Sequence, residues 1–214
     1  ASGMATAAWR GRLYSFGGRG AEGDTNRAFS YNPTTNQWTE LAALPVSGFS
    51  FGSAVALSDA IYVAGGWPAQ RELWRYDPAS DHWSALRPLR AGRYGFAMDT
   101  DGRYIYVAGG GVSWDNLTSV ERYDPQSDTW TSLPSLSVSQ RTGTAGAILD
   151  GRFYVLGGGG GAVTDQVESL DVSTDLGGSY LRLARYATPG DTLPFALTLR
   201  NPSNRAVAAR WEIP

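Results

Sequence analysis

The stretch Ile61-Tyr62-Val63-Ala64-Gly65-Gly66 decides the fold, because variants of it occur four times in the 214 residues. Its glycine pair recurs as Gly17-Gly18, Gly109-Gly110 and Gly157-Gly158, and the first glycines lie 48, 44 and 48 residues apart. An apolar run that ends in two glycines predicts a strand that stops where the chain needs positive φ or a close backbone approach. Its recurrence at a nearly fixed period predicts a repeat protein.

A tyrosine followed seven residues later by a tryptophan is the second repeated feature. An Asn-Pro or Asp-Pro turn follows each of these tyrosines. The pairs are Tyr31 with Trp38, Tyr76 with Trp83, and Tyr123 with Trp130. A further short strand is expected before each glycine pair, joined to it by a tight turn such as Asp150-Gly151. Each unit therefore contains four short strands, and because one such sheet cannot bury both faces alone, radial stacking into a β-propeller is expected.

The repeats divide residues 1–186 into four expected blades. Their approximate boundaries are 1–45, 46–90, 91–138 and 139–186. The fourth unit departs from the pattern, since Leu170 stands where a tyrosine is expected and Tyr180 is the best candidate for the missing tryptophan. We therefore expect an all-β propeller that is either a small closed ring or part of a larger one.

Residues 187–214 follow a different pattern and predict an amphipathic β-hairpin. Apolar residues alternate with other residues on both sides of the turn at 201–204. Because a lone hairpin is marginal in water, its apolar face is expected to pack on the propeller, to be completed by a partner, or to begin a domain of a longer protein. The docking candidates are Leu193, Phe195, Leu197, Leu199, Trp211 and Ile213.

Composition removes most catalytic chemistries. The chain has no Cys, no Lys and a single histidine, His82. It therefore has no thiolate nucleophile, no Schiff-base lysine and no multi-histidine metal site. The net charge of −2 and the scattered arginines give no footprint for nucleic acid. No apolar run reaches the ~18 residues of a membrane span. We expect no cofactor, no metal and no catalytic residue, although carboxylate-based sugar chemistry stays open.

The repeat resembles the kelch motif, whose pattern is a double glycine after an apolar strand, then a tyrosine and a tryptophan separated by six residues. The resemblance implies a kelch-type propeller, in which the tyrosines and tryptophans pack between blades and the glycines fit a crowded turn near the axis. Enzymes on such propellers that resemble copper-radical oxidases need a Cys-linked tyrosine and two histidines, which this chain lacks. A sugar mutarotase that works with carboxylates and arginine remains an alternative.

The loops after the second strands and the connections between blades are expected to share one face. The binding-face candidates are Arg19, Asp24, Phe49, Trp67, Arg93, Tyr94, Trp114, Asp115, Arg141 and Asp165. Aromatic and arginine side chains on loops are typical of interface hot spots. The competing interpretation is that Phe49, Phe51 and Tyr94 simply fill the space between blades.

Carboxylates recur in two places in the units. Asp24, Asp115 and Asp165 lie in the same loop of three units, but their offsets to the next strand differ, so we expect loop charges and no Ca²⁺ site. Glu121 and Glu168 occupy equivalent positions and could pair with arginines between blades. His82 lies in an Asp-rich turn and is expected at the surface.

The tail also resembles the opening of immunoglobulin-like β-sandwich repeats of bacterial surface proteins, which begin with Pro-Gly-Asp-Thr and alternate to Asn-Pro. This resemblance implies an extracellular or cell-surface location, with a cytoplasmic one not excluded. Our first hypothesis is a non-enzymatic, protein-binding propeller that serves as a subunit or module of a larger extracellular assembly. Self-association and assembly with other chains are both compatible with it. The alternative is a carbohydrate-binding or mutarotase-like kelch propeller.

Overall fold

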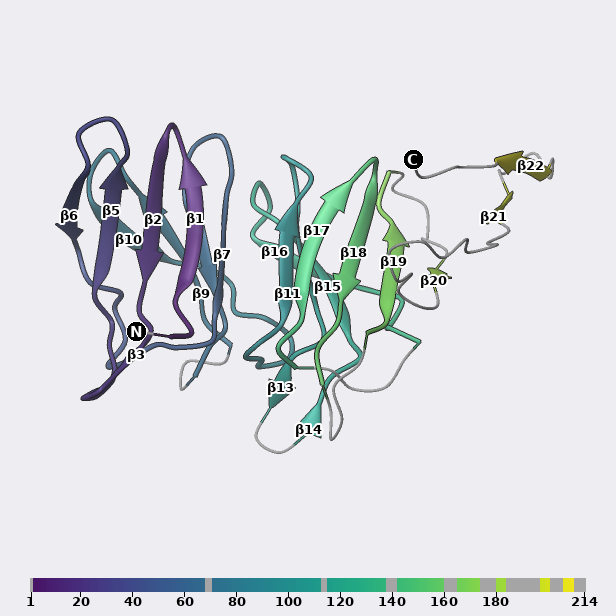
Figure 1. Cartoon of the computed structure of the whole chain (residues 1–214), viewed down its shortest axis with the longest axis horizontal. Helices are drawn as coiled ribbons and strands as arrows, with labels where there is room; N and C mark the ends of the chain where they lie inside the picture. The colour runs from purple at the N-terminus through teal and green to yellow at the C-terminus, as the bar shows by residue number, and fades with distance from the viewer. Residues whose placement is uncertain are drawn as a thin grey trace, which may run out of the picture. The chain divides into compact units, whose positions relative to one another are not determined.

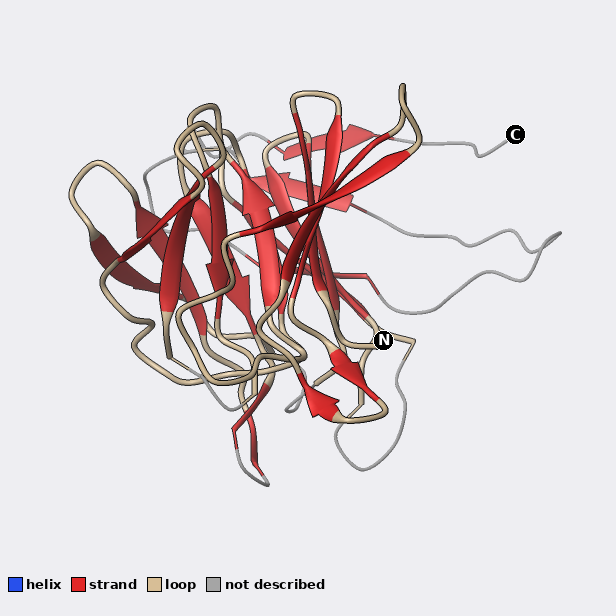
Figure 2. Ribbon diagram, turned by 90° about the vertical axis from the view of Figure 1, so that its left-hand side faces the viewer, coloured by secondary structure: helices blue, strands red, loops and turns tan. Residues whose placement is uncertain are grey.

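The protein is described here from a computed structural model. It describes residues 2–67, 71–112, 115–137, 142–159, 165–173, 180–183, 197–200 and 206–209. These residues form strands, turns and loops with no helix, as Figure 2 shows. The described part accordingly holds no helix that could cross a membrane. The chain falls into two units, Ala1–Ala184 and Arg185–Pro214.

Sixteen strands of the first unit form four sheets, one for each predicted blade (Figure 1). Blade 1 contains β1 (Ala5–Trp9), β2 (Arg12–Phe16), β5 (Ala28–Asn32) and β6 (Gln37–Leu41). Blade 2 contains β7 (Ser53–Ala56), β8 (Ile61–Ala64), β9 (Leu73–Asp77) and β10 (His82–Ala85). Blade 3 contains β11 (Ala97–Thr100), β12 (Ile105–Ala108), β15 (Val120–Asp124) and β16 (Thr129–Leu133). Blade 4 contains β17 (Ala145–Leu149), β18 (Arg152–Leu156), β19 (Val167–Asp171) and β20 (Tyr180–Leu183).

Each blade is an antiparallel meander whose strands pair in chain order. The register places Tyr76 opposite Trp83 and Tyr123 opposite Trp130. In blade 4 it places Leu170 opposite Tyr180, so Tyr180 takes the tryptophan position. The predicted all-β propeller with four four-stranded blades is confirmed.

The blades stack in chain order through their first strands, since β1 packs on β7, β7 on β11, and β11 on β17. An apolar core fills each of the three junctions. Phe16 and Ile61 belong to the first core, Leu89 and Ile105 to the second, and Tyr106 and Phe153 to the third. Side chains from both faces of the inner blades are thus buried, and this burial is the main stabilising contribution expected for the fold.

The second blade explains why the motif carries two glycines. Gly65 and Gly66 have φ of 59° and 91°, a region that favours glycine. A Cβ on Gly65 would lie 2.5 Å from the carbonyl oxygen of Arg93 in the connection to blade 3. Positive φ and close backbone approach, which were predicted as alternatives, therefore occur together.

Three two-stranded hairpins complete the described strands. Two follow glycine pairs in blades 1 and 3, and in Figure 1 they lie at the lower edge of the blades: β3 (Arg19–Gly20) with β4 (Gly23–Asp24), and β13 (Gly111–Val112) with β14 (Asp115–Asn116). In the second unit β21 (Leu197–Arg200) pairs with β22 (Ala206–Ala209), which confirms the predicted hairpin. Leu197 and Leu199 lie in β21, whereas Leu193, Phe195, Trp211 and Ile213 lie outside the described residues.

Candidate binding face

The residue after each glycine pair is tied to the segment that enters the same blade. In blade 2 the N–H of Trp67 donates to the Ser50 carbonyl at 2.7 Å and the N–H of Ser50 donates back at 2.9 Å. The same reciprocal pairing recurs in every blade. The pairs are Ser2 with Arg19, Ser50 with Trp67, Tyr94 with Gly111, and Thr142 with Gly159. The fold therefore provides four equivalent pairs of positions on one edge, and the side chains at these positions differ between blades.

A backbone ladder connects these entry segments from blade to blade. The N–H of Phe51 donates to the Gly3 carbonyl at 2.7 Å, Gly95 to Phe51 at 2.7 Å, and Gly143 to Gly95 at 2.6 Å. All four residues have positive φ, between 57° and 69°. Three of them are glycine, so Phe51 is the single residue that holds a side chain in this conformation.

The side chains at these positions form a group of aromatic residues on blades 2 and 3 with an arginine from blade 1. Phe51 and Trp67 are each 40% exposed, and Tyr94 is half-buried. The rings of Trp67 and Tyr94 meet edge to face at 5.9 Å, and the Arg19 guanidinium lies 5.9 Å from the Phe51 ring. We refer to Arg19, Phe51, Trp67 and Tyr94 as the aromatic face. Blade 4 contributes only Thr142, Gly143 and Gly159 at the equivalent places.

The charge on this face is held in a defined position. Arg19 donates two hydrogen bonds to the carboxylate of Asp24, at 2.8 and 3.0 Å, across the β3–β4 hairpin. The hydrogen bond from Arg19 holds the pKa of Asp24 below its usual range, and Asp24 raises the pKa of Arg19. The guanidinium is thus oriented beside the aromatic rings.

Two of the residues predicted for the face are buried, which corrects the expectation for their side chains. Phe49 fills the junction of blades 1 and 2, where Gly17, Gly52 and Gly66 leave room for its ring. Arg93 is fully buried between blades 2 and 3, where it pairs with Glu121 and donates to the carbonyl of Gly109 at 2.6 Å.

The buried glutamates organise the connections between blades. The Glu121 carboxylate accepts hydrogen bonds from the backbone N–H groups of Arg90 and Ala91 in addition to its contact with Arg93. Glu168 accepts the N–H of Ser137 at 2.8 Å in the next junction. The predicted pairing of Glu121 with an arginine is therefore present, and it serves the junction of two blades.

The other predicted face residues are less informative. Asp165 is exposed, and Asp115 lies in β14. Trp114, Arg141 and the side chain of Asp115 lie outside the described residues. Among the residues that the structure describes, no three His, Asp or Glu side chains gather as a metal site. His82 is exposed at the start of β10.

Sequence reasoning left Phe51 open between a place on this face and a filler between blades, although the repeats contain a further clue. When the units are aligned on their glycine pairs, Phe51 falls on Gly3, Gly95 and Gly143. A bulky residue at a position that otherwise holds glycine indicates backbone strain kept for a reason, which often lies at a binding site.

Comparison with known proteins agrees with this architecture. The model of the Kelch motif matches residues 1–45, 48–90 and 92–137, more than half of the chain. The chain therefore belongs to the kelch-repeat family. The matched residues end before blade 4, where the tyrosine and tryptophan are replaced.

Several proteins illustrate the relationship. Kelch-like protein 36 of Rattus norvegicus is 35% identical over 161 residues, which cover 68% of this chain and 25% of that protein. Beta-scruin of Limulus polyphemus is 34% identical over 117 residues, 50% of this chain and 13% of that protein. The chain thus spans about a quarter of the length of the first curated relatives. The solved structure of YjhT has a TM-score of 0.73 at 17% identity and covers 88% of this chain and 66% of its own, which supports the fold alone.

Proposed function

We propose that this kelch propeller is a non-enzymatic module that binds another protein through the aromatic face. The observation that carries the proposal is Phe51, whose exposed side chain occupies a positive-φ position that is glycine in the other three blades. An L side chain in this region costs roughly 1–2 kcal/mol. Such a cost is typical of residues retained for binding.

The chemistry of the face fits a protein partner. Trp, Tyr and Arg dominate interface hot spots, because they combine a large apolar area with a polar group. Arg19 is oriented by Asp24, so less conformational entropy is lost when it is covered. The kelch-like relatives support the general role of an interaction module.

The experiment uses a photo-crosslinking amino acid placed at position 67, with position 82 as a control on another exposed element. Crosslinked proteins from source cells are identified by mass spectrometry, and the purified partner is titrated against variants. We expect the partner to crosslink from position 67 and not from position 82. Trp67→Ala should weaken its binding at least tenfold, whereas His82→Ala should leave it unchanged. Equal crosslinking from both positions, or unaltered affinity of Trp67→Ala, contradicts the proposal.

A sugar ligand is the second candidate, and the exposed Trp67 favours it, because an indole face can stack on a sugar ring. A glycan array and a sugar-anomerisation assay test it directly. Binding that is lost in Trp67→Ala would assign the face to carbohydrate, and no response in either assay removes this candidate.

The wider setting is also part of the proposal. We place the propeller in an extracellular or cell-surface assembly because of the Pro-Gly-Asp-Thr opening of the tail at 189–192 and its alternating segments. Protease accessibility of the protein on intact source cells tests this location. Full protection until the cells are lysed would contradict it.

A further inference from the structure

Trp67 and Tyr94 form a corner within the aromatic face. Their rings are nearly perpendicular, at 84°, and the ring centroids lie 5.9 Å apart. In an edge-to-face pair the edge of one ring meets one face of the other, so at least one face of the Trp67 indole is not covered by Tyr94. Trp67 is 40% exposed. The corner therefore presents ring surfaces at right angles to one incoming side chain.

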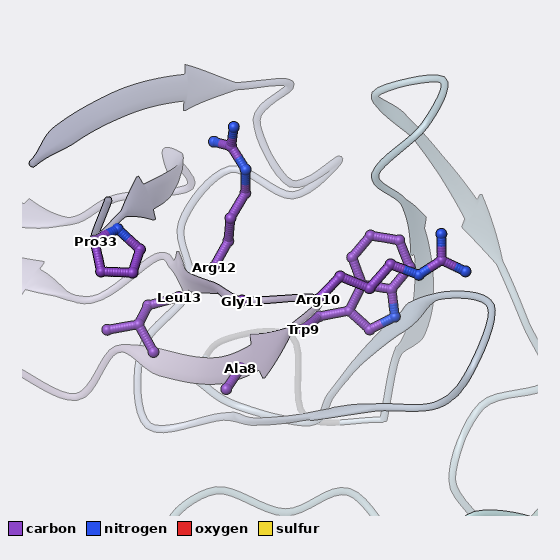
Figure 3. A pocket seen from close by; sticks show the side chains of 7 residues that line it. All are labelled: Ala8, Trp9, Arg10, Gly11, Arg12, Leu13 and Pro33. Carbon is purple, nitrogen blue, oxygen red and sulfur yellow. The ribbon is translucent and has the colours of Figure 1, made fainter. Parts of the chain in front are cut away.

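The chain already places arginines on the faces of its aromatic rings, which carry partial negative charge. The guanidinium carbon of Arg10 lies 4.4 Å from the centroid of the Trp9 ring, and Figure 3 shows this arginine extended across the indole. Within the aromatic face itself, the guanidinium of Arg19 lies 5.9 Å from the Phe51 ring. An arginine on an indole is thus a contact for which this protein contains its own example.

The Trp67 ring has no such cation among the residues that the structure describes. Two arginines of this edge are bound to carboxylates. Arg19 donates two hydrogen bonds to Asp24, and Arg93 is buried in its pair with Glu121. Both are therefore compensated where they stand, and a cation for the corner has to come from outside the described residues.

The charges on this edge suit a cationic group better than an anionic one. Glu22, between β3 and β4, and Asp165, before β19, follow glycine pairs as Trp67 does. Both are exposed, and neither forms an ion pair with a described residue. Arg71, on the loop after Trp67, donates from Nε to the Leu89 carbonyl at 3.0 Å. A partner carboxylate would thus meet uncompensated carboxylates and arginines that already have acceptors, whereas a partner cation meets the favourable arrangement.

We propose, on the basis of the function proposed above, that the corner of Trp67 and Tyr94 binds an arginine side chain of the protein partner. The guanidinium stacks on the exposed indole face, as Arg10 does on Trp9. Arginine is favoured over lysine because its planar guanidinium stacks on aromatic faces and is more weakly hydrated than an ammonium group. Tryptophan attracts a cation more strongly than tyrosine or phenylalanine does.

Nuclear magnetic resonance of the ¹⁵N-labelled protein tests this binding without the partner. The probe is the blocked tripeptide acetyl-Gly-Arg-Gly-amide, and the matched control contains citrulline, which has nearly the same shape and no charge. The indole N–H resonances of Trp67 and Trp9 are assigned by their loss in Trp67→Phe and Trp9→Phe. We expect a saturable shift of the Trp67 resonance with the arginine peptide and about three- to fivefold weaker binding of the citrulline peptide. The Trp9 resonance is the internal control and should move much less, because Arg10 already lies over that ring.

Tetrafluorotryptophan at position 67 separates cation binding from apolar contact. Fluorine withdraws negative charge from the ring face and keeps the apolar area, so the arginine peptide should bind several-fold more weakly. The backbone N–H resonance of Tyr94 follows binding in this variant.

Equal binding of the two peptides, an equal response of Trp9 and Trp67, or undiminished binding to the fluorinated protein overturns the proposal. The failure of the proposed function has a different signature, which is unaltered partner affinity in Trp67→Ala. A partner that crosslinks at position 67 and loses affinity in Trp67→Ala, without any preference of the protein for the arginine peptide, retains the proposed function and overturns the arginine site alone.

Discussion

Phe51 shows how one residue can combine a structural cost with an exposed ring. Its N–H and carbonyl hold the ladder between Gly3 and Gly95, as the glycines do elsewhere. Backbone bonding therefore does not require a side chain at this position. The side chain is an addition to this bonding, and its ring lies beside Gly3 and the Arg19 guanidinium.

We predict that Phe51→Gly is more stable than Phe51→Ala by about 1 kcal/mol. Both variants remove the ring, but only glycine adopts φ of 57° without strain. Urea unfolding monitored by fluorescence measures the difference. An alanine variant as stable as the glycine variant would show that the backbone is unstrained here.

Arg93 was predicted to lie on the binding face, but in the structure it stabilises the packing of two blades. It lies with Glu121 in the junction of blades 2 and 3, where both side chains are buried. Breaking a buried pair leaves one charge without compensation.

We predict that Arg93→Met lowers the free energy of unfolding by about 3–5 kcal/mol. The control Arg27→Met breaks the exposed pair of Arg27 with Glu40, where the N–O distance is 2.8 Å, and should cost much less because solvent screens that pair. Denaturant unfolding compares the two. Similar losses would mean that the buried pair contributes no more to stability than the exposed pair does.

At the scale of elements, the fourth strand of each blade serves its neighbour as much as its own sheet. Trp83 pairs with Tyr76 within blade 2 and donates to the carbonyl of Ala42 in the exit of blade 1. The same residue type therefore has a different environment in blade 1, where nothing described covers it.

We predict that Trp83→Phe costs about 1–2 kcal/mol, because the Ala42 carbonyl loses its donor. Trp38→Phe should change the free energy of unfolding by less than about 0.5 kcal/mol. Chemical denaturation of both variants checks the contrast. A cost for Trp38→Phe as large as that for Trp83→Phe would contradict it.

The turns between third and fourth strands make the elements sensitive to acid. Backbone N–H groups hold the pKa values of Asp77 and Asp124 below the usual range, through Ala79 and Gln126 respectively. An aspartate whose pKa is lower in the folded state than in the unfolded state, where it is near 4, stabilises the fold at pH values above the unfolded-state pKa. This stabilisation is lost as the pH falls through the folded-state pKa. Asn32 makes the equivalent bond to the Thr34 N–H without titrating.

We therefore predict that the double variant Asp77→Asn, Asp124→Asn loses less stability between pH 5 and pH 3 than the natural chain. The decrease is reduced and not abolished, because the pKa values of Asp24 and Glu40 are lowered too. Urea unfolding at both pH values provides the measurement. Identical decreases would show that these turns do not control the acid sensitivity.

At the scale of the whole first unit, the importance of a residue depends on whether a neighbouring blade covers it. Leu13 and Ile61 occupy the same position in β2 and β8, and only Ile61 is buried. Identical chemistry at the two sites should thus have different consequences.

We predict that Ile61→Ser destabilises the protein by about 3 kcal/mol or more, since it leaves a cavity and a buried hydroxyl. Leu13→Ser should change stability by about 0.5 kcal/mol or less. Thermal unfolding distinguishes them. A large loss for Leu13→Ser would mean that this face is covered in the protein alone.

The amino-acid sequence is enough to define the repeat, the four-stranded blade and the class of fold. Glycine pairs, Asn/Asp-Pro turns and the Tyr–Trp spacing act locally, so each unit records its own strands and turns. The expected pairing of Glu121 with an arginine also came from equivalent positions in the repeats.

The packing of the blades was needed to show which side chains face a neighbouring blade. Phe49 and Arg93 were predicted to lie on the binding face, but the junctions between blades bury them. Trp38 was predicted to pack between blades, but it is exposed. The burial of a side chain depends on which blade stacks against it, and a local sequence motif does not specify the adjacent blade. For the same reason the positive φ of Phe51 becomes visible only when equivalent positions are compared in space.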